Sequence, residues 1–74
     1  MKLLLFENVH RVMRAEQLLL AAGVPCELLP TPQHISRECG MCIGVENVRL
    51  PAAERALAGV AHRVADAPRR EEIA

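Results

Sequence analysis

The sequence predicts a single α+β domain in which two helices cover one face of a four-stranded antiparallel sheet. Two observations support this fold class. The chain has only 74 residues, which suffices for one domain with a small core. Its apolar residues fall into short runs and helically spaced segments in the order strand, helix, strand, strand, helix, strand. Two such split units form the ferredoxin-like βαββαβ sandwich.

The first half of the chain contains the clearest elements. Residues 2–6 form a short apolar run that is typical of a buried strand. Asn8 is a favoured N-cap residue for a helix that the periodicity predicts over residues 9–22. Gly23 then stands where a left-handed C-cap is expected. A second strand is predicted over residues 24–29.

The second half begins with a loop over residues 30–40, because two prolines near its start withdraw backbone donors from any ladder. Residues 41–46 predict a third strand in which alternate side chains point to opposite faces. A second helix is expected from residue 50 to near residue 59, with Pro51 in its first turn. A short fourth strand over residues 60–65 completes the pattern.

The strands carry apolar residues on both sides, although helices can cover only one face of the sheet. We therefore expect the other face to be bare and apolar, which is typical of an interface, and predict a homodimer through it. The domain is expected to span residues 1–66. Residues 67–74 are polar and charged, so we expect a frayed tail.

Composition argues against several classes of function. Nine Lys and Arg residues balance nine Asp and Glu residues, and Phe6 is the only aromatic side chain, so neither phosphate attraction nor base stacking favours nucleic-acid binding. The apolar run near the N-terminus is too short for a signal peptide or a membrane span, and we expect a cytoplasmic protein without membrane contact. We find no Ser-His-carboxylate arrangement and no glycine-rich phosphate loop, and do not expect an enzyme.

The three cysteines differ in their predicted surroundings. Cys26 lies inside the second predicted strand, where a thiol usually serves as a small hydrophobic residue. Cys39 ends the polar loop and is followed by Gly40, so we expect it near solvent, on a backbone that another molecule can approach. Cys42 begins the third strand and is either a packing residue or a partner of Cys39.

Three polar residues of the same loop are predicted to surround the Cys39 thiol: His34, Ser36 and Arg37. His34 and Arg37 would favour the thiolate, whereas the adjacent Glu38 would oppose it. We predict that Gly40, with these three residues, forms the binding surroundings of Cys39.

The spacing of Cys39 and Cys42 leaves the chemistry open. A C-x-x-C pair serves in thiol redox sites and in zinc sites, but zinc needs four ligands and would have to recruit His34 and Cys26 or a second copy of the chain. A redox pair would gain from the N-terminus of a helix, and here the pair precedes a strand. We expect no cofactor, and keep as alternatives a dimeric binding module with metal ligands and a dithiol redox pair.

Residues 6–46 resemble the selenium/sulfur carrier protein-like family of small bacterial proteins. The resemblance rests on the order and spacing of five short motifs: Ala15-Glu16, Gly23-Val24-Pro25, Pro30-Thr31-Pro32, Ile35-Ser36 and Cys39-Gly40. It implies that Cys39 is the carrier thiol, which accepts sulfur or selenium as a persulfide or perselenide and passes it to a partner protein.

The implied donor is an enzyme such as a cysteine desulfurase or a selenocysteine lyase; the acceptor is not named by the resemblance. Cys42 departs from the family pattern, which has an aliphatic or small residue there. If its thiol can reach Cys39, Cys42 could act as a resolving thiol that expels the sulfur as sulfide.

Overall fold

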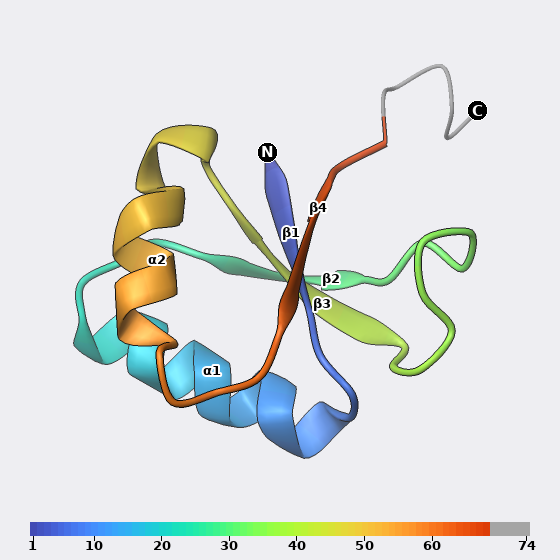
Figure 1. Ribbon diagram of the computed structural model, residues 1–74, viewed down its shortest axis with the longest axis horizontal. Helices are drawn as coiled ribbons and strands as arrows, with labels where there is room; N and C mark the ends of the chain where they lie inside the picture. Colours follow the sequence, from blue (N-terminus) through green and yellow to red (C-terminus); the bar gives the residue numbers. More distant parts are fainter. Residues whose placement is uncertain (69–74) are drawn as a thin grey trace.

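The computed structural model describes residues 1–68 and confirms the predicted α+β fold class (Figure 1). In chain order its elements are β1 (Lys2–Leu5), α1 (Val9–Ala21), β2 (Glu27–Pro30), β3 (Met41–Val45), the 3₁₀ turn η1 (Asn47–Arg49), α2 (Leu50–Ala56) and β4 (Arg63–Asp66). The four strands form one sheet in the order β2-β3-β1-β4, and all neighbours are antiparallel. This order places β1 and β3 in the centre, as the ferredoxin-like arrangement requires. None of the described helices has the length and apolar character needed to cross a membrane.

Both helices pack against the same face of the sheet. Their buried side chains join those of β1 and β3 in one cluster, which we call the helix-side core: Leu4, Phe6, Val12, Ala15, Leu19, Val24, Cys39, Ile43, Val45, Ala53 and Leu57. The cluster is almost wholly aliphatic, as the composition requires. Because close packing of branched side chains tolerates few voids, this core holds the two helices in register with the sheet.

The predicted ends of α1 are confirmed. Asn8 accepts a hydrogen bond at its Oδ1 from the amide of Arg11 at 3.0 Å, which satisfies one of the free amides of the first turn. Gly23 follows the helix with a φ of +74°, in the left-handed region that glycine adopts without strain. These two residues set the length of α1 to within one residue of the predicted helix.

Strand β2 starts later than predicted. Val24 is buried in the helix-side core and Pro25 has no amide to donate, so pairing with β3 begins only at Glu27. Cys26 therefore precedes the strand, and its predicted place inside the strand is wrong. Its half-buried side chain still packs against the helix-side core, as expected of a small hydrophobic residue.

The last two elements are also shifted. Helix α2 ends at Ala56, and the amide of Val60 donates to the carbonyl of Leu57 at 2.9 Å, which closes a turn where the sequence predicts the start of a strand. Strand β4 begins only at Arg63, the residue that pairs with Leu5 of β1. The fourth strand therefore exists as predicted, but it begins three residues later than predicted.

The sheet face opposite the helices is covered at its centre, so the prediction of a bare apolar face is wrong there. Leu3 and Leu5 are only 2% and 4% exposed, and Cys42 is fully buried in the same cluster. Four partly buried side chains pack over this second cluster: Leu29, Ile35, Ala65 and Ala67. Ile35 belongs to the loop between β2 and β3, so the loop itself shields the sheet.

Ala67 also donates its amide to the carbonyl of Met1 at 3.1 Å, which continues the β1–β4 pairing past Asp66. Of the predicted tail, residues 69–74 lie outside the described residues.

Candidate functional site

The loop between β2 and β3, residues 31–40, carries most of the predicted site residues. Its two ends are held together, because the amide of Thr31 donates to the carbonyl of Gly40 at 2.9 Å. Inside the loop the amides of Ile35 and Ser36 both donate to the carbonyl of Pro32, at 3.0 and 3.2 Å, and form a tight turn. In Figure 1 the loop, drawn in green, extends beyond the ends of β2 and β3. The backbone hydrogen bonds therefore give this segment a defined shape.

Cys39 is more buried than predicted. The residue is 8% exposed and belongs to the helix-side core, whereas the sequence predicts a position near solvent. The reason is the pairing of Thr31 with Gly40, which holds the base of the loop against the sheet and keeps the residue before Gly40 within reach of the core. The polar neighbours in the sequence do not reveal this, because the burial of Cys39 depends on how the loop folds back onto the core.

Cys39 nevertheless lines a surface hollow of about 520 Å³, which we call the Cys39 hollow. Its walls are Pro30, Thr31, Gln33, Ser36, Arg37, Cys39 and Gly40. Three predicted surrounding residues, Ser36, Arg37 and Gly40, thus share one hollow with the thiol. Arg37 is exposed, makes no ion pair with a described residue, and is the one charged side chain among the described residues of the wall. An anion that enters the hollow would therefore meet a free guanidinium.

His34 is placed differently from the other predicted site residues. It is exposed and lines a separate, mainly apolar hollow of about 570 Å³, whose walls include Met1, Leu3 and Leu29. The tight turn at Ile35 separates it from Cys39. The structure therefore does not bring His34 to the thiol.

Cys42 lies on the other side of the sheet from Cys39. Its thiol is fully buried in the second cluster, 3.9 Å from the carbonyl oxygen of Pro30. Burial raises the pKa of Cys42; the nearby Thr31 hydroxyl opposes this effect, and a negative charge on Cys39 would add to it. The Thr31 Oγ1 atom is buried and makes no hydrogen bond of ordinary geometry with a described residue. All three cysteines are free.

A comparison with known families decides what kind of protein carries this site. Residues 2–70 match the model of the family described as "putative Se/S carrier protein-like". The chain belongs to this Se/S carrier-like family. The match spans both helices and all four strands, so the resemblance of residues 6–46 extends to the whole domain. Neither the curated proteins nor the solved structures contain a match.

Cys26, the third cysteine of this Se/S carrier-like chain, is unsuited to thiolate chemistry. Burial raises the pKa of Cys26, and the negative charge of Glu16 raises it further. Both effects favour the neutral thiol, which is the form that packs well and reacts poorly. Cys26 is therefore best described as a packing residue.

The residues proposed as alternative zinc ligands do not converge. Within residues 1–68, no three His, Cys, Asp or Glu side chains lie close enough together to hold one metal ion. Cys39 and Cys42 pack into clusters on opposite faces of the sheet, and the exposed His34 lines the apolar hollow on the face that holds Cys42. A metal site built from these residues would need ligands from a second molecule.

One residue at the site was missed by the sequence analysis. Arg63, the first residue of β4, reaches the loop with its Nη2 atom, which lies 3.3 Å from Ser36 Oγ and 3.5 Å from Glu38 Oε1. The Ser36 hydroxyl also accepts a hydrogen bond from the amide of Glu38 at 3.4 Å. No local pattern could predict these contacts, because 27 positions separate Arg63 from Ser36 and only the antiparallel pairing of β4 with β1 brings them together.

Proposed function

We propose that this protein carries one sulfur or selenium atom on Cys39, as a persulfide or perselenide, and transfers it to a partner protein. The observation that carries the proposal is that Cys39 lines a surface hollow together with Arg37, which makes no ion pair with any residue of the range 1–68. Cys42 is sealed inside the second cluster, and burial keeps it in the thiol form. The family match supports a carrier role in general.

The chemistry is a thiol exchange at sulfur. The Cys39 thiolate attacks the outer sulfur of a donor persulfide, R–S–SH; the new bond joins the two sulfurs, the donor S–S bond breaks, and the donor leaves as the thiolate R–S⁻. The product is Cys39–S–SH, and no electrons enter or leave. Transfer to an acceptor thiolate repeats the same displacement in the other direction. Arg37 would favour both the attacking thiolate and the ionised persulfide, since each carries a negative charge.

The burial of Cys39 restricts which donors can serve. With 8% of the residue exposed, the donor sulfur has to enter the hollow, because the thiol does not project from the surface. A donor whose persulfide stands on a mobile or protruding segment meets this requirement. We propose that the donor is a cysteine desulfurase or a selenocysteine lyase. We also propose that this protein acts as a stoichiometric carrier and not as an enzyme.

Cys42 has a smaller part in this proposal than the C-x-x-C spacing predicts. A resolving step, in which the Cys42 thiolate displaces sulfide from Cys39–S–SH, would require one of the two side chains to leave its cluster and cross the edge of the sheet. The raised pKa of Cys42 further lowers the fraction of thiolate. Transfer to an external acceptor is the favoured fate of the sulfur.

A homodimer and a cytoplasmic location stay predictions. The main reason to expect a dimer was a bare sheet face, and the centre of that face is covered. The apolar hollow that the exposed Met1 lines still favours a dimer. Gel filtration with light scattering decides the point, and a clean monomer at high concentration would contradict the dimer. A reducing compartment suits three free cysteines.

The proposal is tested by intact mass after incubation with a cysteine desulfurase and cysteine, and separately with a selenocysteine lyase and selenocysteine. We expect the wild type to gain one sulfur or one selenium, which dithiothreitol removes. Cys39→Ser should gain nothing, whereas the matched variants Cys26→Ser and Cys42→Ala should gain the same mass as the wild type. No gain by the wild type from either donor, or an undiminished gain by Cys39→Ser, would sink the proposal.

A further inference from the structure

Two neighbouring residues of opposite charge, Arg37 and Glu38, face different hollows. Arg37 lines the Cys39 hollow. Glu38 lines a second hollow of about 270 Å³ between the loop and β4, which we call the Glu38 hollow and whose walls also include Phe6, His62 and Arg63. The two charged residues that directly precede Cys39 in the sequence therefore line different hollows.

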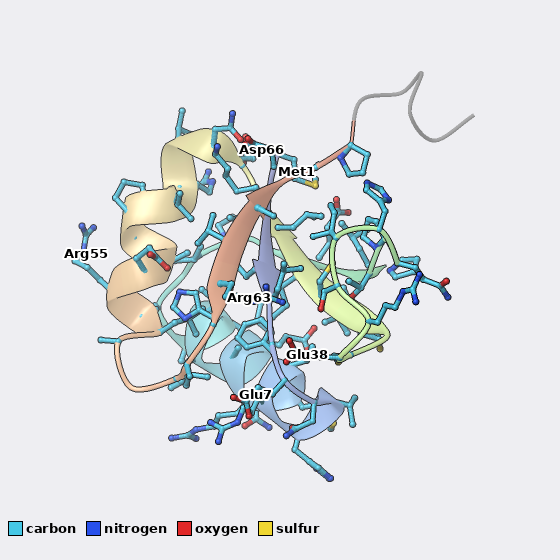
Figure 2. All side chains as sticks on the ribbon, turned by 45° about the vertical axis from the view of Figure 1, so that its right-hand side comes forward. Met1, Glu7, Glu38, Arg55, Arg63 and Asp66 are labelled. Atoms are coloured by element: carbon cyan, nitrogen blue, oxygen red, sulfur yellow. The ribbon has the colours of Figure 1, made fainter. Side chains whose placement is uncertain are left out.

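Arg63 contacts the Glu38 carboxylate and the Ser36 hydroxyl. Its guanidinium contacts Glu38 Oε1 at 3.5 Å and Ser36 Oγ at 3.3 Å, on the two sides of Arg37 in the sequence. Figure 2 shows Arg63 of β4 and Glu38 of the loop near one another, while Arg55 lies on α2, far from this loop. The contact brings a positive charge to the one carboxylate of the loop.

The other charged groups of the Glu38 hollow do not replace Arg63 in this role. Glu7 is the second carboxylate there and lies 3.9 Å from Arg11 of α1. The ring of His62 is committed to Glu54 and to the carbonyl of Val60. On the thiol side, a negative charge on Cys39 would raise the pKa of Cys42, and Arg37 is the charged side chain that lines the Cys39 hollow. Among residues 1–68, Arg63 is thus the cation that contacts Glu38.

We propose that Arg63 is a positioning residue for the Cys39 site: it offsets the charge of Glu38 and holds that carboxylate in the Glu38 hollow, so that Arg37 is the unbalanced charge beside the thiol. The inference rests on the proposed function only in taking Cys39 as the working thiol. It explains why a loop that carries both a cation and a carboxylate can favour a thiolate. The net effect of these two charges on the thiol cannot be decided from the sequence of the loop.

The expected effect is modest, because both side chains of the pair are well exposed, with 60% and 59% of their surfaces accessible. Solvent screens such pairs strongly, so removal of Arg63 should slow thiolate reactions of Cys39 at neutral pH by about two- to threefold. The same change should move the pH profile of the reaction to higher pH, a shift that purely structural anchoring would not produce.

The test is the rate of Cys39 alkylation by iodoacetamide as a function of pH, with fragmentation mass spectrometry to separate Cys39 from Cys42 on the same peptide. Arg63→Met should slow alkylation and raise the midpoint of the profile. Glu38→Gln should not slow it, and the double variant Arg63→Met/Glu38→Gln should return to the wild-type rate, because no carboxylate is left to offset. Arg55→Met, which removes an exposed arginine on α2, should behave like the wild type.

Two results would overturn the inference: an unchanged profile in Arg63→Met, or a double variant as slow as Arg63→Met alone. Circular dichroism and thermal melting of each variant show whether the fold is intact. Alkylation needs no sulfur donor, so the result is independent of sulfur loading. A chain that never accepts sulfur can still confirm the role of Arg63, and a chain that accepts sulfur can still contradict it.

Discussion

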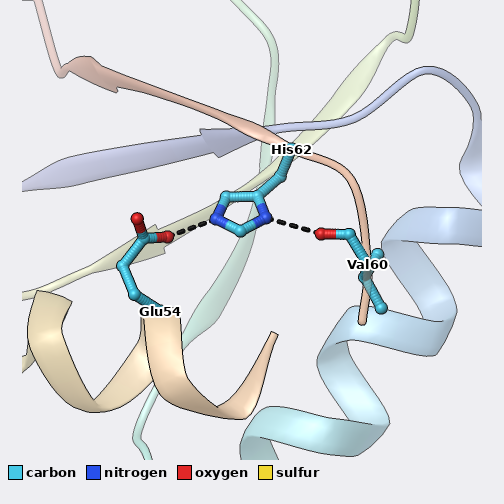
Figure 3. A network of polar contacts seen from close by, with 3 residues as sticks. All are labelled: Glu54, Val60 and His62. Atoms are coloured by element: carbon cyan, nitrogen blue, oxygen red, sulfur yellow. Dashed lines mark hydrogen bonds and ion pairs between the residues drawn. The ribbon is translucent and has the colours of Figure 1, made fainter. Parts of the chain in front are cut away.

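The contact between His62 and Glu54 predicts that part of the folding stability depends on pH. Nδ1 of His62 donates to the carbonyl oxygen of Val60 at 2.7 Å, and Nε2 meets the carboxylate of Glu54 (Figure 3). Neither oxygen can donate, so only the doubly protonated imidazolium satisfies both contacts. Burial opposes the charged ring, but the contacts with Glu54 and Val60 outweigh this effect and raise the pKa of His62.

The direction of the pH dependence follows from this raised pKa. The folded chain binds the proton more tightly than the unfolded chain, whose histidine titrates near 6.5. The stabilisation by His62 is therefore fully present below pH 6.5 and is lost as the pH rises through the higher pKa of the folded state. Glu54→Gln removes the charge that favours the imidazolium, so its cost should be large at pH 6 and small at pH 9.

The size of the effect is limited by exposure. The His62 side chain is 12% exposed, but 46% of Glu54 is accessible to solvent, which places the pair between a buried charged hydrogen bond and a surface ion pair. We expect Glu54→Gln to cost about 1 kcal/mol at pH 6. A domain of this length has a total stability of about 4–11 kcal/mol, so the loss is measurable and leaves the chain folded.

The assay is urea denaturation at pH 6 and pH 9, with Glu46→Gln as the matched control. Glu46 contacts Arg49 at 2.9 Å, and arginine keeps its charge over this range, so the cost of the control substitution should be equal at both pH values. If Glu54→Gln costs the same free energy at pH 6 and pH 9, the doubly bonded imidazolium is refuted.

Three further substitutions test the fold by the same denaturation method. Asn8→Ala should cost about 1 kcal/mol because the amide of the first turn loses its acceptor, and Asn8→Ser should retain most of the stability; equal losses would contradict the N-cap. Leu57→Ala leaves a cavity at a fully buried position and should cost about 2–5 kcal/mol; a loss below that of Asn8→Ala would argue against the close packing of Leu57 in the helix-side core. Gly23→Ala should cost about 1–2 kcal/mol at a φ of +74°, whereas Gly59→Ala, with open space around it and no positive φ, should be nearly neutral.

The architecture could be predicted from local signals. The order of apolar runs identifies the elements, Asn8 and Gly23 mark the ends of α1, and the alternation along β3 places Cys42 on the face away from the helices. These signals are local because hydrogen bonding within a helix and side-chain alternation in a strand both depend on neighbouring residues. Strand boundaries were less predictable, since β2 and β4 begin where a partner strand offers its backbone.

The site could be predicted only in part. Cys39, Ser36, Arg37 and Gly40 share a hollow as expected, because they belong to one short loop. The place of His34 depends on the turn at Ile35, which turns it toward another region of the surface.

The sequence by itself determined the α+β fold class, the family and the cysteine that stands at the end of the loop. The tertiary structure decided how buried that cysteine is, which face of the sheet each thiol enters, and which cation meets Glu38. Each of these depends on tertiary contacts: Thr31 with Gly40 at the base of the loop, Ile35 over the sheet, and Arg63 against Ser36. Such contacts form only when the sheet is assembled, so no local pattern of residues can encode them.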